Sequence, residues 1–139
     1  MAERMQQTMP EAGNGWVLVN AGKHLIVLFH RNRRLPGQDD DIVRPTISVG
    51  VPGKGHQVIR LDPFSKDGHR HVLPTQTDTP IPLVSKDGQS SLDAALELFE
   101  EPDRFRELLA EAEEHQTARE VTDEDLMGVA RQIREICRT

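Results

Sequence analysis

The chain has 139 residues, of which 36% are hydrophobic and 29% charged, and its formal net charge at pH 7 is −6. A chain of this length can bury a core as one domain without metal or disulfide staples. The excess of acidic residues argues against a nucleic-acid partner, because a protein that binds nucleic acid needs a broad positive potential on its surface. The single cysteine, Cys137, excludes an intrachain disulfide framework and a multi-cysteine zinc site.

The first two predicted features are an arm and a hairpin. Residues 1–14 are polar and contain Pro10, which predicts a mobile N-terminal arm. Residues 15–19 and 24–29 are rich in β-forming side chains, and the Asn-Ala-Gly-Lys between them predicts a tight turn. Both runs are apolar on both faces, so we expect this hairpin in the centre of the sheet, covered on each side. Its expected core residues are Trp16, Val17, Val19, Leu25, Val27 and Phe29.

Further strands are predicted as far as residue 84. Residues 46–51 alternate between apolar and polar side chains, as a half-buried strand does. Short strands follow at 57–61 and 69–73. Three prolines between residues 74 and 82 disfavour a central strand, so 81–84 is expected as a short edge strand.

Helical spacing of apolar residues begins after Ser90. We expect a first helix with Ser91 as its N-cap, and a second whose first turn contains Pro102, which lacks an amide proton. A last helix opens with Thr122, followed three residues later by Asp125, a near match to a capping box.

The segregation of strands and helices along the chain predicts an α+β fold. We expect an antiparallel sheet of about five strands, as a half-barrel or small sandwich, followed by two to three C-terminal amphipathic helices. The predicted organisation is a mobile arm over 1–14 and one domain over 15–139, with strands in 15–84 and helices in 90–138.

One histidine pair has the spacing of metal ligands. In a strand, His69 and His71 point to the same face, so both imidazoles can meet one divalent ion. His56 or His30 is a candidate third ligand, and Asp62 or Asp67 a candidate carboxylate. Such a set suits zinc or non-haem iron. No carboxylate follows His71 within five residues, and we therefore expect these imidazoles to lack a convergent third ligand.

The one basic cluster lies in the first long loop, at Arg31, Arg33 and Arg34. Guanidinium groups bind carboxylates, phosphates or acidic protein surfaces, which makes the cluster a candidate partner-binding site. The alternative interpretation is a solvated loop end balanced by the three aspartates at 39–41.

The sequence leaves three classes of function open. Small size and the absence of a catalytic motif favour a non-catalytic accessory subunit, adaptor or inhibitor as the first class. Such a protein would have no cofactor and would bind another protein or form an oligomer. The apolar stripe of the last helix, at Leu126, Val129, Ile133 and Ile136, is its candidate interface. The alternatives are a small metal-dependent enzyme or metal carrier, using zinc or iron at His69 and His71, and a small-molecule-binding barrel. The absence of a signal peptide or an apolar run of about 20 residues predicts a soluble, cytoplasmic protein that does not enter a membrane.

Overall fold

The computed structural model describes residues 8–33, 37, 42–66, 68–73, 81–83 and 86–138. The described chain forms one antiparallel sheet followed by helices, which confirms the predicted α+β class. The strands follow one another in the order β1-β2-β3-β4-β5-β6. They are β1 (Trp16–Val19), β2 (Ile26–His30), β3 (Thr46–Gly50), β4 (Gln57–Asp62), β5 (His69–Val72) and β6 (Ile81–Pro82). The helices are α1 (Ser91–Glu100), α2 (Pro102–Glu111), α3 (His115–Glu120) and α4 (Asp123–Cys137).

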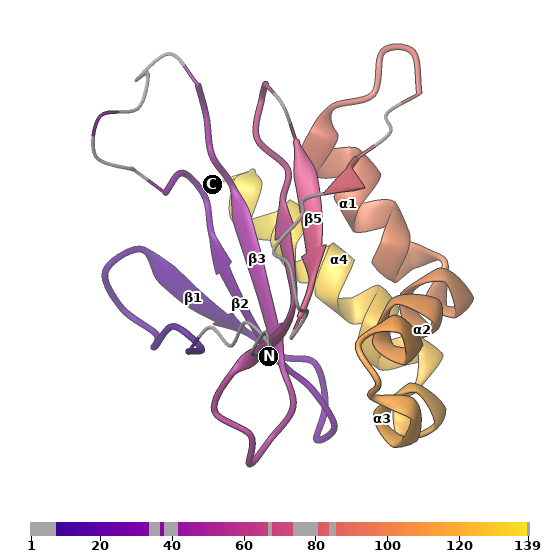
Figure 1. Cartoon of the computed structure of the whole chain (residues 1–139). Coiled ribbons are helices and arrows are strands. Elements are labelled where there is room, and N and C mark those ends of the chain that lie inside the picture. Colours follow the sequence, from indigo (N-terminus) through magenta and orange to yellow (C-terminus); the bar gives the residue numbers. More distant parts are fainter. Residues whose placement is uncertain are drawn as a thin grey trace, which may run out of the picture.

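The helices cover one face of the sheet (Figure 1). Alternate side chains of β2, β3 and β4 point to this face, and the strand register aligns Phe29 with Ile47 and Leu61. These three side chains are fully buried. The stacked rings of Phe99 in α1 and Phe105 in α2, with centroids 4.4 Å apart, belong to the same core. This face therefore holds the hydrophobic core.

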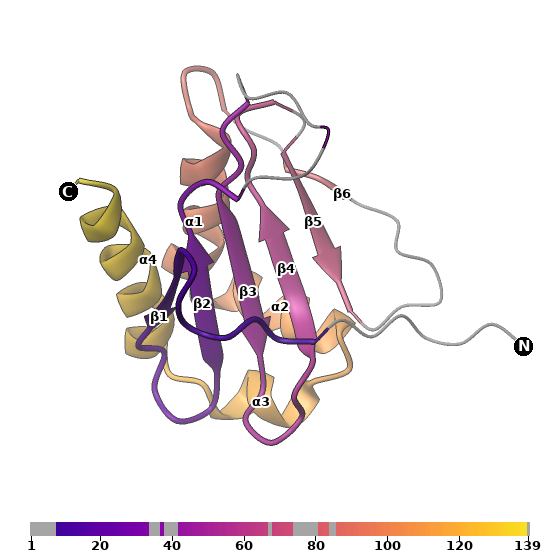
Figure 2. The same cartoon turned by 90° about the vertical axis from the view of Figure 1, so that its left-hand side faces the viewer.

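The other face of the sheet, called the polar face, is covered by no described helix; it carries polar side chains on β3, β4 and β5, whereas Leu18 and Leu28 lie on it in β1 and β2. The same alternation places Thr46 and Ser48 of β3 on this face, both fully buried. The described part of the N-terminal arm, residues 8–14, crosses the face (Figure 2). The Met9 amide donates a hydrogen bond to the Gly55 carbonyl at 3.2 Å, and Met9 Sδ lies 3.5 Å from the Ser48 hydroxyl. The arm thus covers part of a buried polar surface.

The expectation that the first hairpin is central was wrong. β1 is an edge strand of the sheet, and Val17 and Leu18 are 41% and 62% exposed. Of the expected core residues, Val19, Leu25, Val27 and Phe29 are buried, whereas Trp16 is only half-buried. A strand that is apolar on both faces does not reveal how many neighbours it has. The outer edge of β1 is protected instead, because Gly13 pairs with Trp16 and the Gln132 side chain of α4 bonds the Asn20 backbone.

The structure confirms two of the predicted helix starts and corrects the third. Thr122 caps α4 by accepting a hydrogen bond from the Asp125 amide, and Pro102 begins α2. Ser90, not Ser91, caps α1, accepting from the Asp93 amide. Four helices are described instead of two to three, because the short polar α3 was not recognised. No helix within the described residues is long and apolar enough to cross a bilayer.

A substitution on α4 tests the assignment of its apolar stripe to the core. Ile133 is fully buried, whereas Met127 on the same helix is 47% exposed. We expect Ile133→Asp to lower the free energy of unfolding by at least about 3 kcal/mol, because it places a charge in the core. Urea unfolding followed by circular dichroism measures the change. The matched variant Met127→Asp should cost less than about 1 kcal/mol, and equal losses would contradict the assignment.

A second prediction concerns the ion pairs between α4 and α1. Arg134 donates to Asp93 at 2.7 Å and to Glu100 at 2.8 Å. The hydrogen bond from Arg134 is the main cause that lowers the pKa of Asp93. The stabilisation that this ion pair gives the folded protein is therefore complete above the ordinary aspartate pKa of about 3.9. It is lost as the pH falls through the lowered pKa that Asp93 has in the folded protein.

We expect Arg134→Gln to cost about 1 kcal/mol or less at pH 7, because the pair is partly exposed. The difference from wild type should shrink at pH 3, as measured by urea unfolding at both values. Arg138→Gln, which breaks a pair whose two side chains are each 70% exposed, serves as the control. A loss that is the same at both pH values would show that the Asp93 charge is not involved.

Candidate metal centre

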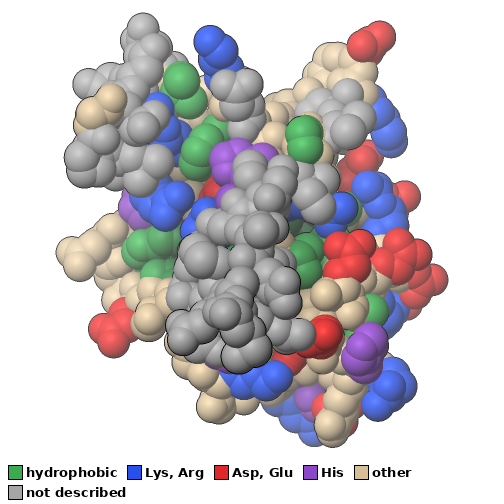
Figure 3. Space-filling view, in the orientation of Figure 1, with side chains coloured by type: hydrophobic (Ala, Val, Ile, Leu, Met, Phe, Trp, Pro, Cys, Tyr) green, Lys and Arg blue, Asp and Glu red, His purple; other side chains and the backbone are tan. Residues whose placement is uncertain are grey.

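Three of the residues considered as ligands converge on the polar face of the sheet. The Oδ2 atom of Asp62 lies 3.0 Å from Nε2 of His69 and 3.3 Å from Nε2 of His71. The potential ligand atoms of the three residues all lie within 4.8 Å of one another. The Asp62 side chain is 1% exposed, and the histidine side chains are 24% and 6% exposed, in the same order. Figure 3 shows histidine side chains gathered on the surface in view, with lysine or arginine side chains nearby.

The β4–β5 hairpin builds this cluster from local sequence. Antiparallel pairing places Asp62 opposite His69 and Arg60 opposite His71. Residues two apart in a strand share a face, so all four side chains lie on the polar face. Gly68 lets the hairpin approach the start of α1 closely, because a Cβ atom there would lie 2.8 Å from Ser91 Oγ. The register of one hairpin therefore determines the geometry of the site.

Two guanidinium groups accompany the buried Asp62 carboxylate. Arg60 Nε donates a hydrogen bond to Asp62 Oδ2 at 3.0 Å, and Arg33 Nη2 lies 3.9 Å from Oδ1. Burial lowers the pKa of Arg33, the Asp62 charge opposes that shift, and the nearby Arg60 charge adds to it. A carboxylate that is this deeply buried needs such partners, since an isolated buried charge is strongly destabilising.

Surrounding contacts orient the rings and close this end of the sheet. The ring of His69 packs edge-to-face on Phe64, with centroids 5.4 Å apart, and similarly on His71 at 4.9 Å. The guanidinium of Arg44 lies 6.0 Å from the centroid of the Phe64 ring. The Ser65 amide donates to the Val43 carbonyl at 2.8 Å, which ties the β4–β5 loop to the segment before β3. The imidazoles are therefore held from more than one side.

These distances match those between ligands on one metal ion. Zinc binds histidine nitrogen and carboxylate oxygen at about 2.0–2.2 Å, so neighbouring ligand atoms lie about 3.0–3.5 Å apart. Both Asp62–histidine separations fall near this range. The hydrogen bond from Arg60 is of the kind that orients a ligating carboxylate from the outer shell. Asp62, His69 and His71 thus form a two-histidine, one-carboxylate set.

The expectation that no third potential ligand converges was wrong, because the Asp62 carboxylate lies close to both imidazoles. Asp62 was one of the two candidate carboxylates, but the expectation rested on the absence of a carboxylate after His71, and Asp62 precedes His69. His56 does not join the described group. It lies in the β3–β4 turn, with its Nδ1 atom 3.1 Å from the Lys54 carbonyl. His30 packs on Trp16 two strands from β4, and Asp67 lies outside the described residues.

The basic cluster of the first loop is divided in the structure. Arg33 turns inward and faces Asp62. Arg31 is exposed, and its charge acts on the Cys137 thiol of α4, whose pKa is raised by burial and partly lowered again by Arg31. Arg34 lies outside the described residues. A partner-binding role for the cluster stays a prediction, but Arg33 lies beside Asp62 of the candidate metal centre.

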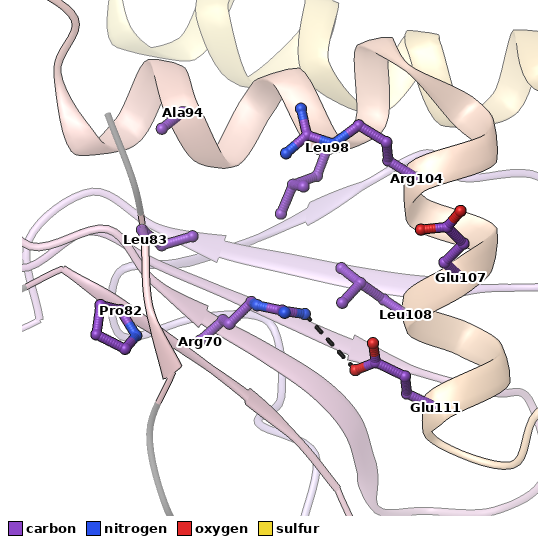
Figure 4. Close-up of a pocket in the computed structure, with 9 residues that line it drawn as sticks. All are labelled: Arg70, Pro82, Leu83, Ala94, Leu98, Arg104, Glu107, Leu108 and Glu111. Carbon is purple, nitrogen blue, oxygen red and sulfur yellow. Dashed lines mark ion pairs between the residues drawn. The ribbon is translucent and has the colours of Figure 1, made fainter. Parts of the chain in front are cut away.

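The residue between the two histidines points away from the site. Arg70 faces the helices, where its Nη1 atom lies 3.7 Å from Glu111 Oε2 of α2 (Figure 4). There it lines a cavity of about 250 Å³, whose other lining residues include Leu98 and Leu108. The sheet therefore separates the Arg70 charge from the two imidazoles, as the alternation in β5 predicts.

Comparison with known proteins identifies no family and no structural relative for this chain. No protein-family model, no curated protein and no solved structure matches the chain. The chemistry of the site must therefore carry the functional argument.

Replacing the carboxylate tests the charge balance of the site. Asp62→Asn keeps the side-chain shape but leaves two largely buried guanidinium groups facing a neutral amide. We expect a loss of about 3 kcal/mol in the free energy of unfolding of the metal-free protein, measured by urea unfolding in the presence of a chelator. Asp87→Asn, at an exposed position, is the control. Similar losses in the two variants would contradict the central role of Asp62.

Proposed function

We propose that this chain is a metal-dependent protein in which Asp62, His69 and His71 bind one divalent transition-metal ion. The observation that supports the proposal is the Asp62 carboxylate, 1% exposed, with Oδ2 at 3.0 and 3.3 Å from the Nε2 atoms of two histidines. Two imidazoles and a carboxylate are the ligands of catalytic zinc sites and of non-haem iron(II) sites. Zinc and iron(II) are the metals that this donor set favours.

The number of protein ligands favours a reactive ion over a purely structural one. Structural zinc sites are closed by four protein ligands, whereas catalytic sites have three and an open position. The described residues supply three. An ion in such a set acts as a Lewis acid on a bound oxygen or lowers the pKa of bound water. The proposal therefore favours a small metal-dependent enzyme over a metal carrier.

The adaptor hypothesis has lost one of its candidate surfaces. One interface that the sequence offered to a partner was the apolar stripe of the last helix. Leu126, Val129 and Ile133 are instead fully buried in the core, and Ile136 packs partly buried against it. Binding to another protein stays a proposal, but the metal centre has the better geometric support.

Metal titration tests the proposal directly. Untagged protein, stripped with a chelator and dialysed, should bind one Zn²⁺ or Co²⁺ per chain in calorimetric titration. The double variant His69→Ala, His71→Ala should lose affinity by more than about 100-fold, because even outer-shell partners contribute about 10–100-fold. Element analysis of the protein as purified would then identify the metal acquired in the cell.

The matched control removes a histidine from outside the group. His56→Ala should bind the metal as the wild type does, because His56 lies in the β3–β4 turn and contacts the Lys54 carbonyl. Equal binding by wild type and the double variant would overturn the proposal. A loss on removing His56 alone would move the site to other ligands.

A further inference from the structure

Arg33 is held so that its side chain reaches the metal centre. Its backbone amide donates to the Arg44 carbonyl at 2.8 Å, in the connection between β2 and β3. Its Nη2 atom lies 3.9 Å from Asp62 Oδ1. That distance exceeds the roughly 3.2 Å limit of a normal N–H···O hydrogen bond. Arg33 thus faces the site without closing a hydrogen bond to its carboxylate.

Polar atoms of both residues are left unsatisfied at this point. Among the described residues, Arg33 Nε and Asp62 Oδ1 are buried and have no hydrogen-bond partner. Buried polar groups nearly always have one, so such atoms require an explanation. Nε and Nη2 lie side by side on one edge of the guanidinium group. This edge carries two parallel N–H groups and matches the two oxygens of a carboxylate.

The charge of the site also favours an anion. A divalent ion on Asp62, His69 and His71 would add two positive charges beside the guanidinium groups of Arg33 and Arg60. These positive charges, which lie close together around Asp62, would repel one another. An anion placed between the ion and Arg33 would reduce this repulsion.

We infer that the open coordination position of the metal takes a small carboxylate ligand, held by the Nε and Nη2 edge of Arg33. The inference rests on the proposed metal site and names the class of ligand or substrate that the site accepts. A carboxylate is planar and carries a single charge, and its two oxygens are spaced to receive the two N–H groups. Arg33 selects this ligand by geometry as well as by charge.

Spectroscopy of the cobalt form separates the two proposals. Co²⁺ bound to the protein gives visible absorption bands that change when its ligands change. Acetate, added at constant ionic strength, should alter these bands in a saturable way. In Arg33→Gln the apparent acetate dissociation constant should rise at least 10-fold, while the Co²⁺ dissociation constant changes less than threefold. In Arg33→Lys, which keeps the charge but not the paired N–H groups, the acetate dissociation constant should lie between those of the wild type and Arg33→Gln. Arg33→Lys replaces Arg33→Gln if that variant does not fold.

Arg31→Gln is the matched control, since it removes the same charge from an exposed position two residues away. It should bind acetate as the wild type does. Equal acetate binding by wild type and Arg33→Gln, or cobalt bound without any response to acetate, would overturn the carboxylate inference alone. Tighter binding of inorganic phosphate than of acetate would replace carboxylate by a tetrahedral oxyanion. Failure to bind cobalt would overturn the metal site and the inference with it.

Discussion

The burial of one carboxylate governs the polar half of this protein. Asp62 ends β4 with 1% of its side chain exposed, and a charge so placed is tolerated only with partners. Arg60 reaches it along the same strand, two histidines reach it from β5, and Arg33 reaches it from the β2–β3 connection. One negative charge thus draws groups from three parts of the chain into contact.

The two faces of the sheet have different roles because side chains alternate along each strand. The face towards the helices is apolar and holds the core, including Phe29, Ile47 and Leu61. The other face carries Thr46, Ser48 and the Asp62 cluster, of which all but His69 and Arg60 are buried although no described helix covers them. Arg70 shows the separation within a single strand, since it faces the helices while its two neighbours face Asp62. Core packing therefore holds the hairpin rigid without filling the site.

The charges around Asp62 decide what the site can hold. A metal ion is compatible with the carboxylate and two imidazoles, but two guanidinium groups lie close by. Such surroundings are unfavourable for a bare cation and favourable for a cation that carries an anionic ligand. The proposed metal centre and the unsatisfied edge of Arg33 would be explained together by a site that binds an ion and an anion at once.

The sequence by itself determined the elements that depend on local chemistry. Helical spacing, Pro102 and the Thr122 cap predicted where α2 and α4 begin, and strand alternation placed His69 and His71 on one face. Only the tertiary structure decided which strand is the edge, because apolar run length does not report the number of neighbours. It alone showed that Arg33 faces Asp62 whereas Arg31 is exposed, because two arginines in one loop look the same in the sequence. It also selected Asp62 over His56, since antiparallel pairing brings together residues that no local pattern links.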